Sequence, residues 1–72
     1  MLPDVPFSGR KLRTVRKAKG MTILGLSHAA GSTPATIANY EHGRFRPATP
    51  DRLSRLATAL GVSVEDLLDD AA

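Results

Sequence analysis

Residues 22–43 read TILGLSHAAGSTPATIANYEHG and predict two short helices that meet at a turn around Gly31. Residues with a hydroxyl group precede both helices and can cap their N-termini: Thr22 before the first, and Ser32 or Thr33 before the second. Pro34 suits the first turn of the second helix, where no N–H donor is needed. Gly31 suits the turn because glycine adopts a positive φ without steric strain. When the turn is this short, the second helix of the pair can protrude from the fold.

Five residues of this stretch fall at places where each residue type has a structural reason. Counted from Ile23, these places are the fourth, fifth, ninth, fifteenth and eighteenth, and they hold Leu26, Ser27, Gly31, Ile37 and Tyr40. The small residue at the fifth place allows the two helices to touch, and the glycine allows the turn. The three apolar residues anchor both helices to a core. The spacing therefore predicts a helix-turn-helix within a compact all-α domain.

Capping signals on either side predict three further helices, so that we expect five in total. The first runs from a Ser8 cap to about Lys19, the fourth starts at a Thr49 cap and ends at Gly61, and the fifth starts at a Ser63 cap. The short fifth helix is expected to bury Leu67 and Leu68. We expect residues 1–7 to form an N-terminal arm, residues 8–69 the domain, and residues 70–72 a loose tail.

The basic residues are concentrated in the body of the chain, although the net charge is only +3. Every Lys and Arg lies between Arg10 and Arg55, whereas acidic residues gather at the end of the chain: Glu65, Asp66, Asp69 and Asp70. A localised basic surface attracts polyanions such as nucleic acids, or anionic membranes. Composition alone does not choose between these partners.

Several other classes of protein are excluded by the composition. The chain of 72 residues without cysteine holds one small core and has no disulfide or thiolate metal ligand. No apolar run reaches the length of a membrane span, and Met1 to Phe7 lacks the pattern of a signal peptide, so we expect a cytoplasmic protein of a bacterium or phage. His28 and His42 are not at metal-binding spacing, and no catalytic motif is present. We therefore expect a non-enzyme without metal or cofactor.

On these residues the chain resembles the phage repressor and Cro-type (XRE-like) helix-turn-helix family, from about Ser8 to Leu68. The similarity is greatest over residues 56–68, LATALGVSVEDLL, and extends to residues 37–43, IANYEHG. The resemblance implies a lambda-repressor-like fold. It also implies a sequence-specific double-stranded DNA-binding regulator, a repressor, whose recognition helix at about residues 33–42 enters the major groove.

The resemblance also implies roles for individual residues. Base contacts are expected at the groove-facing places of the recognition helix: Thr33, Pro34, Ala35, Thr36 and Asn39. Phosphate contacts are expected in the loop that follows and at helix ends: Thr22, His42, Arg44, Arg46 and Thr49. Asn39 is the strongest candidate for a base contact, since an amide can donate to and accept from adenine together. The family's pairing of a first-helix arginine with a glutamate late in the recognition helix implies a structural ion pair between Arg16 and Glu41.

Three positions depart from the family pattern. Ile23 stands where the family commonly has a glutamine that braces a phosphate, and Pro34 and Ala35 stand where longer polar side chains are usual. Recognition would then rely more on thymine methyls, phosphate contacts and DNA shape. The same departures keep open an alternative of a different class, in which the chain is an antitoxin or another protein-interaction module on this fold.

We expect two copies to act together on a palindromic operator, because one small module buries too little surface for strong specificity. The half-sites would be roughly 34 Å apart, one turn of DNA. Apolar residues beyond the needs of so small a core predict the homodimer interface: Phe45, Val62, Val64, Leu67 and Leu68. A toxin or another regulator is a possible protein partner, and a membrane is not expected as a partner.

Overall fold

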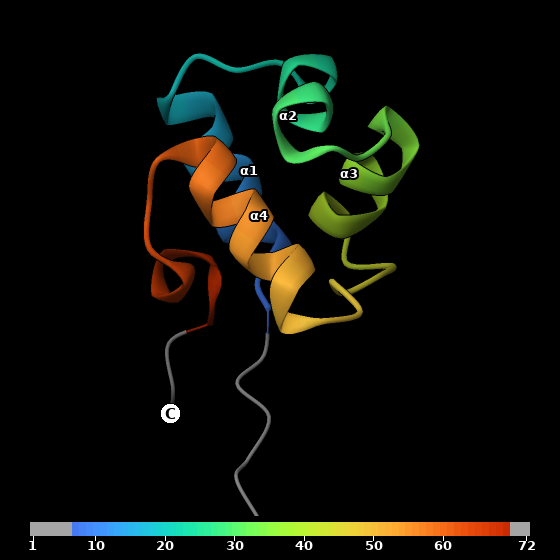
Figure 1. Ribbon diagram of the computed structural model, residues 1–72, viewed down its shortest axis with the longest axis vertical. Helices are drawn as coiled ribbons and strands as arrows, with labels where there is room; N and C mark the ends of the chain where they lie inside the picture. The colour runs from blue at the N-terminus through green and yellow to red at the C-terminus, as the bar shows by residue number, and fades with distance from the viewer. Residues whose placement is uncertain (1–6, 70–72) are drawn as a thin grey trace, which may run out of the picture.

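The computed structural model describes residues 7–69, which form four α-helices and one short 3₁₀ helix (Figure 1). In chain order these are α1 (Gly9–Ala18), α2 (Ile23–Ala30), α3 (Pro34–Glu41), α4 (Pro50–Leu60) and η1 (Val64–Leu67). In Figure 1, α4 crosses in front of α1, and α2 and α3 lie beside that pair. None of the helices within this part of the chain is long and apolar enough to cross a membrane. The prediction of an all-helical fold is confirmed.

A hydroxyl side chain caps each of the four α-helices, because its oxygen accepts a hydrogen bond from a backbone N–H in the first turn. The four bonds are Lys11 N to Ser8 Oγ at 3.1 Å, Gly25 N to Thr22 Oγ1 at 2.9 Å, Thr36 N to Thr33 Oγ1 at 3.2 Å, and Arg52 N to Thr49 Oγ1 at 3.2 Å. These local bonds satisfy donors that a helix N-terminus otherwise leaves unpaired. They fix where the helices begin.

The core lies where the helices converge, since α2 packs against α3 and α4 while α1 packs against α3 and η1. Its buried apolar side chains come from every helix: Leu12, Leu26, Ala30, Ile37, Tyr40, Leu56, Ala57, Leu60 and Leu67. Ser27 is also fully buried at the α2–α3 contact, where its hydroxyl donates to the Leu24 carbonyl at 2.7 Å. Gly31 adopts φ +68° in the turn between the two helices. The five places of the sequence pattern therefore hold the residues that join α2 and α3 to the core.

The predicted fifth α-helix is wrong, because the chain forms only a single 3₁₀ turn at Val64–Leu67. Asp66 accepts a hydrogen bond from the Ser63 backbone N–H at 3.2 Å, which closes the turn locally. Leu68 then becomes extended and forms an antiparallel bridge with Phe7, beside a hydrogen bond from Ser8 N to the Leu67 carbonyl at 2.8 Å. Pairing with the start of the chain thus ends the turn, and Leu68 is only partly buried.

The domain limits predicted from the sequence fall at the edges of the described residues. Phe7, assigned to the arm, packs its ring edge-on against Tyr40 at a centroid distance of 5.9 Å. It therefore belongs to the folded part of the chain. The rest of the expected arm, residues 1–6, and the expected tail, residues 70–72, lie outside the described residues.

Candidate nucleic-acid interface

One side of α3 is buried and the other is open to solvent. Ile37 and Tyr40 point into the core, with 0% and 5% of their surface exposed. The five residues predicted to contact bases lie on the outer side and at the start of the helix, where Thr33, Pro34 and Ala35 are exposed and Thr36 and Asn39 are half-buried. The fold therefore brings this set together on one accessible surface, which we call the α3 face.

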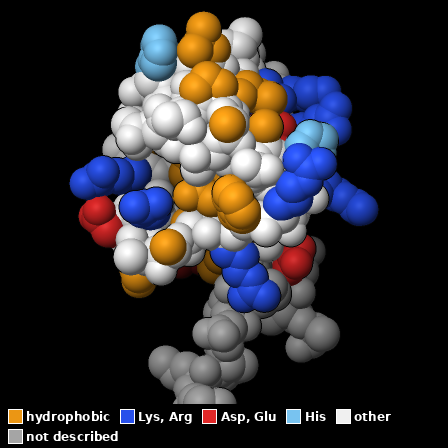
Figure 2. Space-filling view, turned by 90° about the vertical axis from the view of Figure 1, so that its right-hand side faces the viewer, with side chains coloured by type: hydrophobic (Ala, Val, Ile, Leu, Met, Phe, Trp, Pro, Cys, Tyr) orange, Lys and Arg blue, Asp and Glu red, His pale blue; other side chains and the backbone are white. Residues whose placement is uncertain are grey.

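Charged groups flank the α3 face and leave its middle uncharged. Figure 2 views the molecule from the side that carries α3, and Lys and Arg side chains appear at both flanks and at the lower end. The predicted phosphate contacts are all exposed: Thr22, His42, Arg44, Arg46 and Thr49. Within residues 7–69, Arg46 has no carboxylate partner. An uncharged strip between cations matches the layout of a DNA groove between its two phosphate backbones.

The threonines at the helix starts keep some hydrogen-bonding capacity for a ligand. The Thr22 and Thr49 oxygens accept bonds from backbone N–H groups, so their own hydroxyl hydrogens remain available to a phosphate oxygen. The Thr33 and Thr36 hydroxyls share a hydrogen bond of 2.9 Å, which uses one of their two hydrogens and leaves the other to donate outward. This pair therefore offers one hydroxyl donor to a base edge.

A hydrogen bond connects the side-chain amide of Asn39 to the loop that follows α3. Arg44 Nη1 donates to Asn39 Oδ1 at 3.4 Å, and the backbone N–H of Arg44 donates to the Asn39 carbonyl at 2.9 Å. The side-chain bond uses one lone pair of Asn39 Oδ1, so the amide keeps its NH₂ donors and the second lone pair of the oxygen for a base. Asn39 and Arg44 were predicted to have separate roles, and their contact could not be predicted because the bond depends on how the loop leaves α3.

A buried ion pair holds the end of α3 against α1. Arg16 Nε lies 2.6 Å from Glu41 Oε2, a second Arg16 nitrogen donates to Glu41 Oε1 at 3.1 Å, and a third donates to the Met21 carbonyl at 2.8 Å. The two side chains are 9% and 4% exposed. The hydrogen bond to Glu41 raises the pKa of Arg16 further above its ordinary value, against the opposing effect of burial. The pair fixes the position of α3 and leaves no charge on the α3 face.

Ile23, at the place where the family commonly has glutamine, is half-buried and packs against the core. Its apolar character therefore serves the contact of α2 with the rest of the fold.

His28 and His42 are both exposed, and no three side chains of the kinds that bind metals come together within residues 7–69.

The residues predicted to form a homodimer interface do not lie on one surface. Phe45 is 53% exposed in the loop before α4, whereas Val62, Val64 and Leu68 are half-buried around η1. Loop and turn lie on different sides of α4 in Figure 1. Leu67 is 0% exposed and packs in the core, so it has no surface to offer a second copy.

Known proteins are similar to this chain in both sequence and fold. A helix-turn-helix family model matches residues 12–67. The uncharacterized HTH-type transcriptional regulator RghRB of Bacillus subtilis is 35% identical over 63 residues, which are 88% of this chain and 45% of that protein. The restriction-modification controller protein C.AhdI of Aeromonas hydrophila is 30% identical at a TM-score of 0.76, with 82% of this chain and 88% of that chain covered.

A similar fold also occurs as part of an enzyme. The hydroxypropylphosphonic acid epoxidase of S. wedmorenis is 31% identical at a TM-score of 0.83, with 89% of this chain but only 34% of the enzyme covered. The chain also spans less than half the length of the curated relative that it matches. Fold similarity alone therefore does not assign a function, which depends on the residues of the α3 face.

Proposed function

The chain belongs to the helix-turn-helix family, and on this basis we propose that it binds double-stranded DNA as a transcriptional regulator. The observation that carries the proposal is the α3 face, an exposed uncharged strip flanked by exposed arginines and by threonines with free hydroxyl hydrogens. In this mode α3 lies in the major groove. The arginines contact the phosphates, and the buried Arg16–Glu41 pair holds the helix in place.

Base reading in this proposal depends mainly on the Asn39 amide and one threonine hydroxyl. Asn39 donates through its NH₂ group to an acceptor on a base edge, and Arg44 holds the amide oxygen from one side. The NH₂ donors suit the N7 and O6 acceptors of guanine, the O4 of thymine or adenine N7, and the remaining lone pair of the oxygen can accept from adenine N6. The threonine pair of the α3 face adds one hydroxyl donor, and Pro34 and Ala35 offer apolar contact to thymine methyls. Direct readout is therefore modest, and DNA shape contributes to specificity.

We propose that the chain acts as a homodimer on a palindromic operator. A single α3 face offers few base-reading side chains, and two copies would double the number of contacts. Phe45, at 53% exposure beside the basic loop, is the member of the predicted interface set that is most accessible to a second copy. Duplexes selected from a random pool should show two symmetric half-sites about one helical turn apart.

A second candidate function is supported by two exposed apolar side chains. Leu24 on α2 and Phe45 after α3 are each 53% exposed, which suits a protein-interaction module such as an antitoxin. Contact through apolar surface changes little with salt, whereas contact with phosphates weakens steeply as salt rises. Salt dependence therefore separates the two functions.

Arg46→Ala is expected to weaken binding to all duplexes alike and to make binding less sensitive to salt. For about four to six phosphate contacts, the affinity of the unmodified protein should fall by about 10²–10³-fold between 50 and 200 mM salt. Loss of one contact should reduce the slope of log affinity against log salt by about 1. Fluorescence anisotropy with a labelled duplex measures both the affinity and its dependence on salt. Exposed Arg13, on α1, provides the matched control as Arg13→Ala. Affinity that does not respond to salt would contradict DNA binding and favour the protein-interaction module.

Asn39→Ala is expected to relax base preference at one position of each half-site, because it removes the amide that faces the groove. Discrimination there should fall by about 1–3 kcal/mol, while affinity for non-specific duplex stays nearly constant. Selection from a random pool with each variant, followed by competition between matched and mismatched duplexes, measures the change. An unchanged consensus would show that Asn39 does not read a base.

A further inference from the structure

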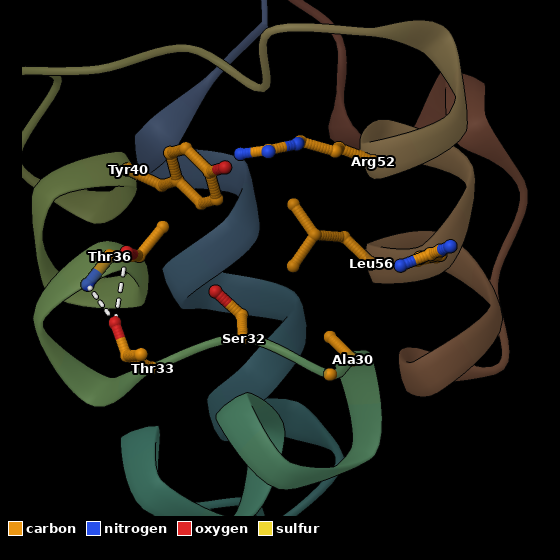
Figure 3. A pocket seen from close by; sticks show the side chains of 9 residues that line it. Ala30, Ser32, Thr33, Thr36, Tyr40, Arg52 and Leu56 are labelled. Carbon is orange, nitrogen blue, oxygen red and sulfur yellow. Dashed lines mark hydrogen bonds between the residues drawn. The ribbon is translucent and has the colours of Figure 1, made fainter.

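A cleft of about 320 Å³ lies between the α2–α3 turn and α4. Its inner wall is apolar, formed by Ala30, Leu56 and the ring of Tyr40 (Figure 3), and the exposed residues Arg52 and Arg55 also line it. The volume is at the small end of the range for sites that bind small molecules. Of the residues that line it, only Thr33 and Thr36 have a role proposed above.

The Tyr40 hydroxyl is an unused hydrogen-bonding group at the inner end of the cleft. Tyr40 is only 5% exposed, and the structure gives its hydroxyl no hydrogen-bond partner within residues 7–69. Figure 3 shows this hydroxyl pointing across the cleft toward the side chain of Arg52. Because no fully buried side-chain N or O atom of the described residues lacks a partner, the hydroxyl keeps some exposure to solvent, and Tyr40 lines the cleft. A phenol placed in this way can donate to a ligand.

The polar groups around the cleft are mainly donors, and the charge there is positive. The side chain of Ser32 also points into the space in Figure 3. Arg55 is partly neutralised, since its Nε lies 3.2 Å from Asp51 Oδ2. Arg52 has no carboxylate partner within the described residues. An anion would therefore meet a guanidinium and two hydroxyl donors beside an apolar wall, where charge-assisted hydrogen bonds are strongest.

We propose that this cleft binds a small organic acid, with one carboxylate on a short apolar body. The carboxylate binds Arg52 and the Tyr40 hydroxyl, and the apolar body lies against Leu56, which is 2% exposed. The apolar wall of Ala30, Leu56 and the Tyr40 ring favours a ligand with an apolar body beside its charged group over a DNA phosphate. Thr33 and Thr36 line the cleft and also belong to the α3 face. Binding of the acid in the cleft should therefore alter DNA affinity. This consequence rests on the proposed function, whereas the site itself does not depend on it.

The test uses the ¹⁵N-labelled protein without DNA, titrated with sodium benzoate at constant ionic strength. Benzamide, which has the same ring without the charge, is the control ligand. We expect saturable shifts of the Ser32, Thr33 and Arg52 amide signals in the millimolar range with benzoate, and at least about tenfold weaker binding of benzamide.

Three variants assign the binding to the cleft. Arg52→Gln should weaken benzoate binding about tenfold or more, and Tyr40→Phe, which keeps the ring in the core, should weaken it several-fold. Arg13→Gln, on the exposed side of α1, should leave it unchanged. The proposal fails if benzoate produces no saturable shifts, if benzamide binds as well, or if Arg13→Gln weakens binding as much as Arg52→Gln. These outcomes do not depend on whether the protein binds DNA.

Discussion

Glu41→Ala is expected to lower the free energy of unfolding by about 3–5 kcal/mol. The substitution leaves the Arg16 guanidinium buried without its carboxylate, and removing one partner of a buried pair costs far more than the pair itself contributes. A domain of this size has a total stability of only about 4–11 kcal/mol. The loss is a large fraction of this total, so the variant should unfold at a clearly lower urea concentration than the unmodified protein.

Urea unfolding followed by circular dichroism measures this effect, and the exposed ion pair of α4 supplies the control. Arg55→Ala breaks a contact whose side chains are 63% and 72% exposed, and the loss should be at most about 1 kcal/mol. Equal losses for the two variants would contradict a structural role for the buried pair. The raised pKa of Arg16 means that its contribution is fully present below the ordinary pKa of arginine and disappears only at more alkaline pH. The difference between the variants should therefore persist at neutral pH.

The starts of all four α-helices could be predicted from the sequence because local chemistry determines them. Each start has a serine or threonine whose oxygen reaches the backbone N–H three residues later, and α3 and α4 also have proline at their first positions. The ends of α2 and α4 follow in the same way from Gly31 and Gly61, which adopt positive φ. None of these signals depends on distant parts of the chain.

The features that were missed depend on contacts between distant residues. The 3₁₀ turn replaces a fifth helix because Leu68 pairs with Phe7, at the opposite end of the described chain. The burial of Leu67 was expected from the sequence, whereas its assignment to the dimer interface does not fit a side chain that is 0% exposed. Capping signals at Ser63 describe only how the turn begins.

The candidate site also contains residues that could be predicted from the sequence and contacts that could not. The resemblance to the family implied the residues of the α3 face, and the helical spacing of Ile37 and Tyr40 predicted which side of α3 is buried. The bond between Arg44 and Asn39 and the cleft beside Arg52 could not be predicted, because they depend on the path of a loop and on how α4 packs against the α2–α3 turn. Arg52, three residues after the Thr49 cap, carries no signal of a ligand site in the sequence.

Gly9→Ala is expected to destabilise the domain by about 2–4 kcal/mol, although alanine favours helices more than glycine by up to about 1 kcal/mol. Gly9 is the first residue of α1, and a Cβ there would lie 2.2 Å from the Tyr40 carbonyl oxygen and 2.9 Å from that of Glu41. Both oxygens belong to the backbone, so no side-chain rotation can relieve the clash. The start of α1 and the end of α3 must move apart, which also strains the nearby Arg16–Glu41 pair.

The neighbouring substitution Arg10→Ala separates the clash from helix propensity, because Arg10 is exposed and lies in the same turn. Urea unfolding should show a change within about 0.5 kcal/mol for Arg10→Ala and a large loss for Gly9→Ala. A Gly9→Ala variant as stable as the unmodified protein would mean that α1 does not approach α3 this closely. Because the displaced segment is the end of the proposed recognition helix, DNA affinity should also fall for the fraction of Gly9→Ala that remains folded. The close approach at Gly9 thus links the stability of the domain to the position of the helix that we propose enters the groove.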